Sequence, residues 1–142
     1  MFDPGMLAYC GLYCEQCSFR TAFVEQDWKH LAVLPLKYNV KNAELSDFDC
    51  ECCRGRNLCG PCKIKDCAAP RNIGSCAECG DFPCGVIEAF GNDGVPHHRQ
   101  ALDNLRAIRK NGVEAWFATL NPAIYCSCGE RQSWYRTCPN HS

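Results

Sequence analysis

The sequence lacks a long apolar segment. Its longest strongly apolar stretch, residues 31–36, is far shorter than the roughly 20 residues that a helix needs to cross a bilayer. The first residues contain neither a basic segment nor an apolar run followed by a cleavage site, which a secretory signal would require. We therefore expect a protein that resides in the cytoplasm and has no membrane partner.

A large excess of charge of one sign is also missing. The chain carries 15 Lys and Arg residues against 16 Asp and Glu residues, a formal net charge of −1. A surface that binds nucleic acid is normally strongly basic. The only support for such a surface is a group of cations and aromatic side chains near the C-terminus, Arg131, Trp134, Tyr135 and Arg136. Nucleic acid is therefore not an expected partner.

Sequence motifs of the common enzyme classes are absent too. The chain has no P-loop, no dinucleotide-binding glycine pattern and no recognisable serine–histidine–aspartate set. Catalysis is therefore not the expected role, although reactive thiolates would leave it open.

Cysteine, in contrast, is abundant, with 15 residues in a chain of 142. Because the number is odd, the cysteines cannot all pair with one another within one chain. In a reducing cytosol thiols stay reduced or bind metals, whereas a disulfide scaffold needs an oxidising compartment. The cysteine content therefore predicts metal binding.

The most sharply defined group of ligands lies at the C-terminus. Cys126 and Cys128 form a C-x-C-G turn, and Cys138 and His141 belong to a Cys-Pro-x-His element nine residues further on. Backbone N–H groups of the first turn can hydrogen-bond the thiolates. Three thiolates and one imidazole make a closed tetrahedral zinc site. The spacing predicts a short hairpin that brings the two turns together.

The middle of the chain repeats one spacing, because C-x₂-C-x₄-C occurs twice and a further C-x₂-C pair precedes both. The eight cysteines would complete two Cys₄ sites. These residues are Cys50, Cys53, Cys59, Cys62, Cys67, Cys76, Cys79 and Cys84. Spacing does not determine how they divide. The grouping that we prefer joins the pairs Cys59/Cys62 and Cys76/Cys79 and leaves the other four for a second site.

The first cluster consists of Cys10, Cys14 and Cys17, which supply three ligands within eight residues. The fourth ligand could be Cys52 or an exogenous group. A site closed by Cys52 would be structural, whereas an open position would be typical of a catalytic metal. The adjacent His97 and His98 could add ligands there, but two histidines before a helix are more often surface residues.

The expected fold is a small metal-stabilised domain, mainly α-helical, with irregular cysteine-rich loops. We expect a cysteine-rich domain over residues 1–122 and a zinc-ribbon-like tail with a short β-hairpin over 123–142. Periodic apolar residues predict helices near 18–34, 97–110 and 113–120. Asn111-Gly112 is a good stop for the second helix, and Pro122 is expected to close the third.

The ligand count predicts three or four Zn²⁺ ions per chain. The function that follows is a zinc-binding protein, a metal-stabilised module that binds a protein partner. Two alternatives stay open. Cysteine thiolates also bind iron, so the chain could be an iron–sulfur redox or accessory protein. It could also be a metal-handling or thiolate–zinc enzyme that uses the cluster of Cys10, Cys14 and Cys17.

Four segments in this order resemble a known prokaryotic family, the cysteine-rich domain of unknown function 3795. They are residues 9–17 (YCGLYCEQC), 59–68 (CGPCKIKDCA), 76–84 (CAECGDFPC) and 104–116 (NLRAIRKNGVEAW). The resemblance implies a bacterial or archaeal protein, zinc binding and no established activity. The chain departs from the family pattern at residues 50–53, which read Cys-Glu-Cys-Cys in place of Cys-x-Gly-Cys. Its tail ends in His141, where a zinc ribbon more often has cysteine.

Overall fold

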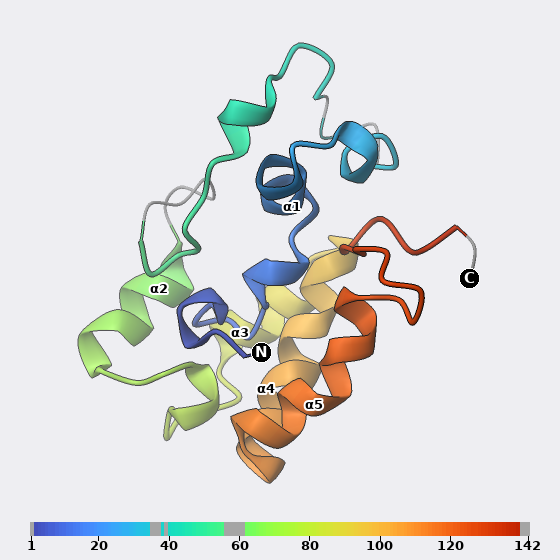
Figure 1. The fold of residues 1–142 in the computed structure, drawn as a ribbon. Helices are drawn as coiled ribbons and strands as arrows, with labels where there is room; N and C mark the ends of the chain where they lie inside the picture. The colour runs from blue at the N-terminus through green and yellow to red at the C-terminus, as the bar shows by residue number, and fades with distance from the viewer. Residues whose placement is uncertain (1, 35–37, 39, 56–61, 140–142) are drawn as a thin grey trace. The chain divides into compact units, whose positions relative to one another are not determined.

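The computed structural model describes residues 2–34, 38, 40–55 and 62–139. They form two compact units, each made of two chain segments. Unit 1 contains residues 1–13 and 51–119, and unit 2 contains residues 14–50 and 120–142. Five α-helices are present in the described part of the chain (Figure 1), and none of them is long and apolar enough to cross a membrane. The helices are α1 (Ser18–Glu25), α2 (Lys63–Ala68), α3 (Gly85–Gly91), α4 (Arg99–Asn111) and α5 (Val113–Ile124).

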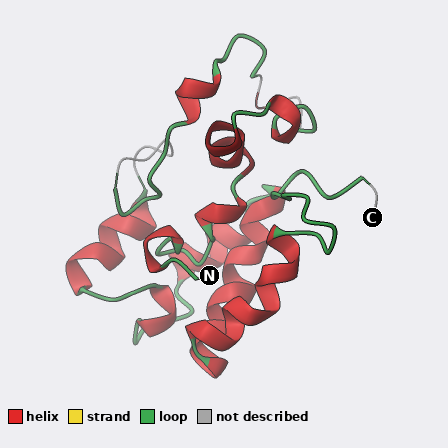
Figure 2. Cartoon of the chain, in the orientation of Figure 1, coloured by secondary structure: helices red, strands yellow, loops and turns green. Residues whose placement is uncertain are grey.

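The chain is mainly helical, as predicted, but the expected hairpin strands are not formed. Figure 2 shows helices and loops and no strand among the described residues. The tail instead contains two isolated antiparallel bridges, Tyr125 with Arg131 and Ser133 with Arg136. Each pairing is a single bridge and does not extend into a ladder. Short 3₁₀ turns supply further order at Pro4–Met6, Cys14–Gln16, Trp28–His30, Leu45–Phe48, Ala69–Arg71, Cys76–Glu78 and Pro96–His98.

Helix α4 forms the centre of unit 1. The residues that the sequence places on one face, Ala101, Leu102, Leu105 and Ile108, are all buried. The helix ends before Gly112, whose φ of 87° lies in the region that favours glycine. Helix α3 packs on α4 and α2 contacts α3. Neither of these short helices was predicted from the sequence.

Gly11 packs directly against α4 within unit 1. Its φ is +95°, and a Cβ atom there would lie 2.7 Å from Leu105 Cγ and 2.8 Å from the Ala101 carbonyl oxygen. The Asn104 side chain donates to the Gly11 carbonyl oxygen at 2.8 Å and accepts from Trp116 Nε1 at 3.1 Å. Only glycine allows this approach, so the backbone at Gly11 lies directly against α4.

Two helix boundaries differ from the sequence predictions. The helix predicted near 18–34 ends at Glu25, because Gln26 adopts a left-handed conformation with φ 51°. A separate 3₁₀ turn follows, started by the Asp27 side chain, which accepts from the Lys29 N–H at 2.9 Å. Helix α5 continues through Pro122, which was expected to close it, and ends two residues later at Ile124. Pro122 removes one helical N–H donor near this end.

Unit 2 consists of α1, the turns around it and the tail. Helix α1 packs on the turns Trp28–His30 and Leu45–Phe48. The Phe19 ring lies 5.3 Å from the Tyr38 ring and 5.6 Å from the Phe48 ring between centroids. These aromatic contacts give the unit an apolar cluster of its own.

Candidate metal centre

The tail begins with a tight turn that carries two thiols. The Gly129 N–H donates to the Cys126 carbonyl oxygen at 2.8 Å, and the Cys126 N–H donates to the Glu130 carbonyl oxygen at 2.9 Å. Gly129 has φ 91°, and a Cβ atom there would meet nothing within 4 Å. Glycine is therefore required at this position by conformation alone, and the turn holds Cys126 and Cys128 side by side.

The third thiol belongs to Cys138, close to the end of the described chain. The Cys138 N–H donates to Gln132 Oε1 at 2.9 Å, and the Cys138 side chain is fully buried. The sulfur atoms of Cys126, Cys128 and Cys138 all lie within 4.8 Å of one another. Among the described residues this is the one group of three or more candidate ligands that meets this distance. The structure thus brings together three of the four predicted tail ligands, and His141 lies outside the described residues.

The distance between two of the thiols suits a single metal ion. The sulfur atoms of Cys128 and Cys138 are 3.6 Å apart. Four sulfur atoms at about 2.3 Å from one zinc ion stand about 3.8 Å from one another. Thiolates that hold a [4Fe–4S] cluster each bind a different iron and stand farther apart, whereas a [2Fe–2S] cluster has two thiolates on each iron.

The turn also favours the thiolate form that binds metal. The Cys128 backbone N–H, followed by the side chains of Cys138, Cys128 and Ser127, lowers the pKa of Cys126 to about 6. A thiol with this pKa is largely ionised at neutral pH, and metals bind the ionised form. The hydrogen bonding from backbone N–H to thiolate that the C-x-C-G sequence indicates is therefore present.

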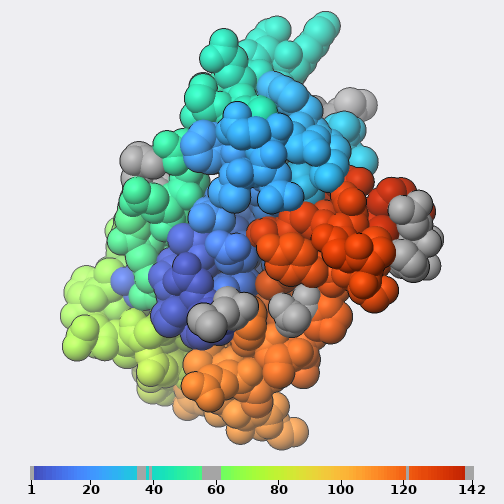
Figure 3. Space-filling view, in the orientation of Figure 1, coloured from blue at the N-terminus to red at the C-terminus, as the bar shows by residue number. Residues whose placement is uncertain are grey.

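Contacts within unit 2 position the tail. Arg131 is 6% exposed and forms an ion pair with Glu15 at 3.3 Å. The Ser133 hydroxyl lies 2.8 Å from Ser18 Oγ and 2.9 Å from His30 Nδ1. The tail, drawn in red in Figures 1 and 3, is thus tied to residues 14–50 by buried polar contacts. Sequence reasoning missed the pairing of Arg131 with Glu15, because residues 116 positions apart leave no local pattern.

The remaining predicted ligands are distributed over both units. Four of them, Cys67, Cys76, Cys79 and Cys84, line one small cavity of unit 1. Cys59 lies outside the described residues.

Cys10, Cys53 and Cys62 also belong to unit 1. Burial raises the pKa of Cys10, and the nearby thiols of Cys53, Cys62 and Cys76 raise it further. These three predicted ligands are therefore neighbours, although their sulfur atoms do not converge as closely as those of the tail.

The site predicted from the first cluster stays a prediction. Cys10 lies in unit 1, whereas Cys14 and Cys17 lie in unit 2, as does Cys50. Cys52, the suggested fourth ligand, is buried in unit 1 and lies with its sulfur 3.6 Å from the Met6 carbonyl oxygen. The Cys52 side chain is also the main cause of the raised pKa of Cys53, through a hydrogen bond between the two thiols.

His97 and His98, the other suggested ligands, occupy the turn before α4. His98 Nδ1 lies 2.7 Å from Asp93 Oδ2, and its ring stacks on Phe90 at 4.0 Å between centroids. A hydrogen bond to Asp93 and a stacking contact with Phe90 account for the position of His98 without a metal.

A comparison with known protein families identifies the chain. A family model described as "Protein of unknown function (DUF3795)" matches residues 6–89. This range includes three of the four segments on which the resemblance rests, and it ends before α4 and the tail. No curated protein and no solved structure matches the chain. Because the match covers more than half of the 142 residues, the chain belongs to the DUF3795 family of proteins of unknown function.

Proposed function

We propose that this chain is a zinc-binding protein whose tail is closed by one structural Zn²⁺ ion. Cys126, Cys128 and Cys138 supply three ligands, and His141 supplies the fourth. The observation that carries the proposal is the convergence of three sulfur atoms within 4.8 Å of one another. Thiolate and imidazole ligands of this number are typical of structural zinc.

A single zinc ion is favoured over a [4Fe–4S] cluster by the sulfur separation. The 3.6 Å between the sulfur atoms of Cys128 and Cys138 suits one ion bound by both thiolates. A [4Fe–4S] cluster would require these thiolates to move apart, against the turn that holds Cys126 and Cys128 together.

The proposed role of this zinc is structural, in a module that binds a protein partner. A site with four protein ligands has no open position for a substrate. Unit 2 also exposes apolar side chains that a partner could cover, since Val24 is 48% exposed, Trp28 44% and Val33 52%. If this is correct, a protein that cross-links to the wild-type chain should be lost from the Cys138→Ala variant and kept in the Ser127→Ala variant.

The experiment that tests the zinc site is metal analysis of matched variants purified without oxygen. Cys138→Ala should contain one zinc fewer than the wild type and should lose amide protection over residues 125–139. Ser127→Ala lies between two ligands and removes no thiol, so it should keep the wild-type zinc content. An unchanged zinc content in Cys138→Ala would refute the tail site.

A further inference from the structure

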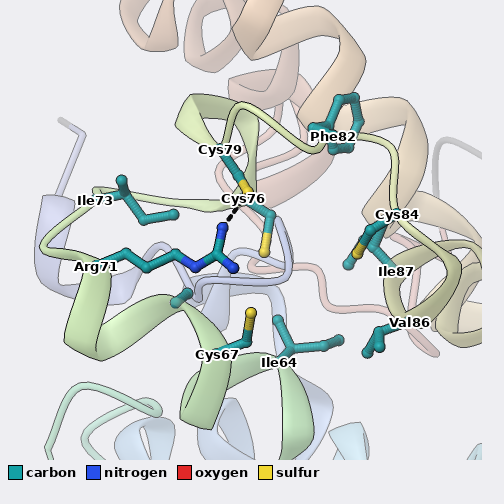
Figure 4. Close-up of a pocket in the computed structure, with 11 residues that line it drawn as sticks. Ile64, Cys67, Arg71, Ile73, Cys76, Cys79, Phe82, Cys84, Val86 and Ile87 are labelled. Atoms are coloured by element: carbon teal, nitrogen blue, oxygen red, sulfur yellow. Dashed lines mark hydrogen bonds between the residues drawn. The ribbon is translucent and has the colours of Figure 1, made fainter.

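The cavity of unit 1 is a second place where thiols converge. It has a volume of about 30 Å³ and is lined by Cys67, Cys76, Cys79 and Cys84 (Figure 4). In the figure the sulfur atoms of Cys67 and Cys76 point toward each other, and Cys79 and Cys84 line the adjoining parts of the cavity wall. Apolar side chains, among them Ile64, Ile73 and Phe82, make up most of the remaining wall. A wall of this kind with four soft ligands suits a thiophilic metal.

The four thiols come from one stretch of the chain that runs from α2 to the start of α3. Cys67 lies on α2, Cys76 begins the 3₁₀ turn Cys76–Glu78, Cys79 ends that turn, and Cys84 directly precedes α3. The four ligands are consecutive cysteines of the chain, so no cysteine of another group lies between them. This grouping differs from the one that spacing alone favours, in which Cys59 and Cys62 join Cys76 and Cys79.

The backbone around Cys76 and Cys79 is fixed by contacts that need no metal. The Cys76 N–H donates to the Tyr9 carbonyl oxygen at 2.8 Å, and Ser75 Oγ accepts from the Ala77 N–H at 3.2 Å. Arg109, on α4, donates to the carbonyl oxygens of Ala77 at 3.0 Å and Cys79 at 2.9 Å. Two thiols of the cavity are therefore held in place before any ion binds.

Positive charge on the cavity wall also suits thiolate ligands. Arg71 supplies positive charge on the cavity wall and donates to Cys79 Sγ at 3.2 Å. A guanidinium in this position can offset part of the formal charge of −2 of a Cys₄ zinc site.

The four sulfur atoms do not yet converge on one point. No three of the four sulfur atoms all lie within 4.8 Å of one another. Binding therefore has to draw them inward, and rotation about the Cα–Cβ bond of a cysteine moves its sulfur without displacing the backbone.

We propose that Cys67, Cys76, Cys79 and Cys84 form a second metal site, which binds one Zn²⁺ ion as a tetrathiolate with Arg71 hydrogen-bonded to the Cys79 thiolate. The site shares no ligand with the tail, so either site can fail without the other. It leaves Cys10, Cys53 and Cys62 as a separate group in unit 1.

The test compares zinc contents of combined variants of the full chain, purified without oxygen. Cys67→Ser/Cys84→Ser and Cys76→Ser/Cys79→Ser should each lose one zinc, and the quadruple variant should also lose only one. If the four cysteines instead serve two sites, each pair still removes zinc but the quadruple variant loses two. Loss of two zincs, or of none, overturns the proposal. Ser46→Ala, at an exposed position of the Leu45–Phe48 turn, removes no thiol and is the control that should keep all its zinc.

A measurement on the wild type keeps the proposal testable if these variants do not fold. After exchange of zinc for ¹¹³Cd, a ¹H–¹¹³Cd correlation spectrum identifies the cysteines whose β-protons couple to each cadmium ion. One cadmium should couple to Cys67, Cys76, Cys79 and Cys84 together. Coupling of Cys62 and Cys76 to the same ion would refute this grouping, and so would native protein that contains iron and sulfide at these thiols.

Discussion

The tail and the cavity of unit 1 gather thiols in two different ways. In the tail, Cys126 and Cys128 are two residues apart, and one hydrogen-bonded turn places them next to Cys138. In the cavity, the four cysteines extend over residues 67–84 and depend on α2, α3 and the contacts of Arg109 with the Cys76–Glu78 turn. The tail sulfurs already lie within 4.8 Å of one another, whereas those of the cavity do not. Local turn chemistry is thus enough to assemble a ligand group, while a group built by tertiary packing needs the ion to complete it.

Metal removal should lower stability more than any substitution. It should affect the tail and the cavity of unit 1 alike. Apparent zinc binding in small peptides amounts to about 10–16 kcal/mol, against about 5–15 kcal/mol for the stability of a whole domain. Chelation under reducing conditions should therefore abolish amide protection in residues 62–91 and 125–139. Hydrogen exchange followed by mass spectrometry measures this directly.

Restoring zinc is the control for that experiment. Protection should return in both segments when zinc is added after the chelator is removed. If residues 62–91 stay protected without metal, α2 and α3 are stable through packing alone, and the cavity is not a metal site that maintains the fold.

The contrast between the two regions also explains what the sequence can predict. The apolar face of α4 and the stop at Gly112 follow from local periodicity, and the tail triad follows from the C-x-C-G turn. Helix α1 ends early because Gln26 takes a left-handed conformation, which no sequence signal marks. The short helices α2 and α3 are too short to show a period. The grouping of Cys67, Cys76, Cys79 and Cys84 depends on how those helices pack, and the role of Arg71 depends on it as well.

A pair of glycine substitutions compares how unit 1 and the tail turn contribute to the free energy of unfolding. Gly11 in unit 1 and Gly129 in the tail both have positive φ, but only Gly11 approaches another backbone. Gly11→Ala should lower the free energy of unfolding by about 3 kcal/mol, because a left-handed conformation and overpacking against Leu105 and Ala101 both contribute. Gly129→Ala adds only the conformational strain and should cost about 1 kcal/mol.

Chemical denaturation of the two zinc-loaded variants measures this difference. Equal losses of stability in Gly11→Ala and Gly129→Ala would show that the close approach of Gly11 to α4 adds nothing to the free energy of unfolding. A larger loss in Gly129→Ala would mean that the tail turn governs unfolding of the whole chain.

Substitution of Arg71 should have the smallest effect. It should lower the zinc affinity of the cavity without changing that of the tail. Arg71→Ala removes the guanidinium that donates to Cys79 Sγ, so zinc affinity at the cavity should fall about tenfold. The tail site, in unit 2, should keep its affinity. Competition with a chromophoric chelator resolves the two sites by their affinities.

Lys63→Ala is the matched control for Arg71→Ala. It removes the same charge at the first residue of α2, where the structure gives the side chain no contact with a cavity thiol. An equal loss of affinity in both variants would mean that net charge, and not the hydrogen bond to Cys79, is responsible.

Elemental analysis of the protein purified without oxygen shows whether the chain binds zinc at two separate thiolate sites. The measurement counts zinc, iron and acid-labile sulfide per chain and records the absorption spectrum. Two separate thiolate sites, one in the tail and one in the cavity of unit 1, predict a colourless protein with at least two zinc ions per chain and no sulfide. A brown protein with stoichiometric iron and sulfide, or a chain that retains fewer than two zinc ions, would contradict the claim.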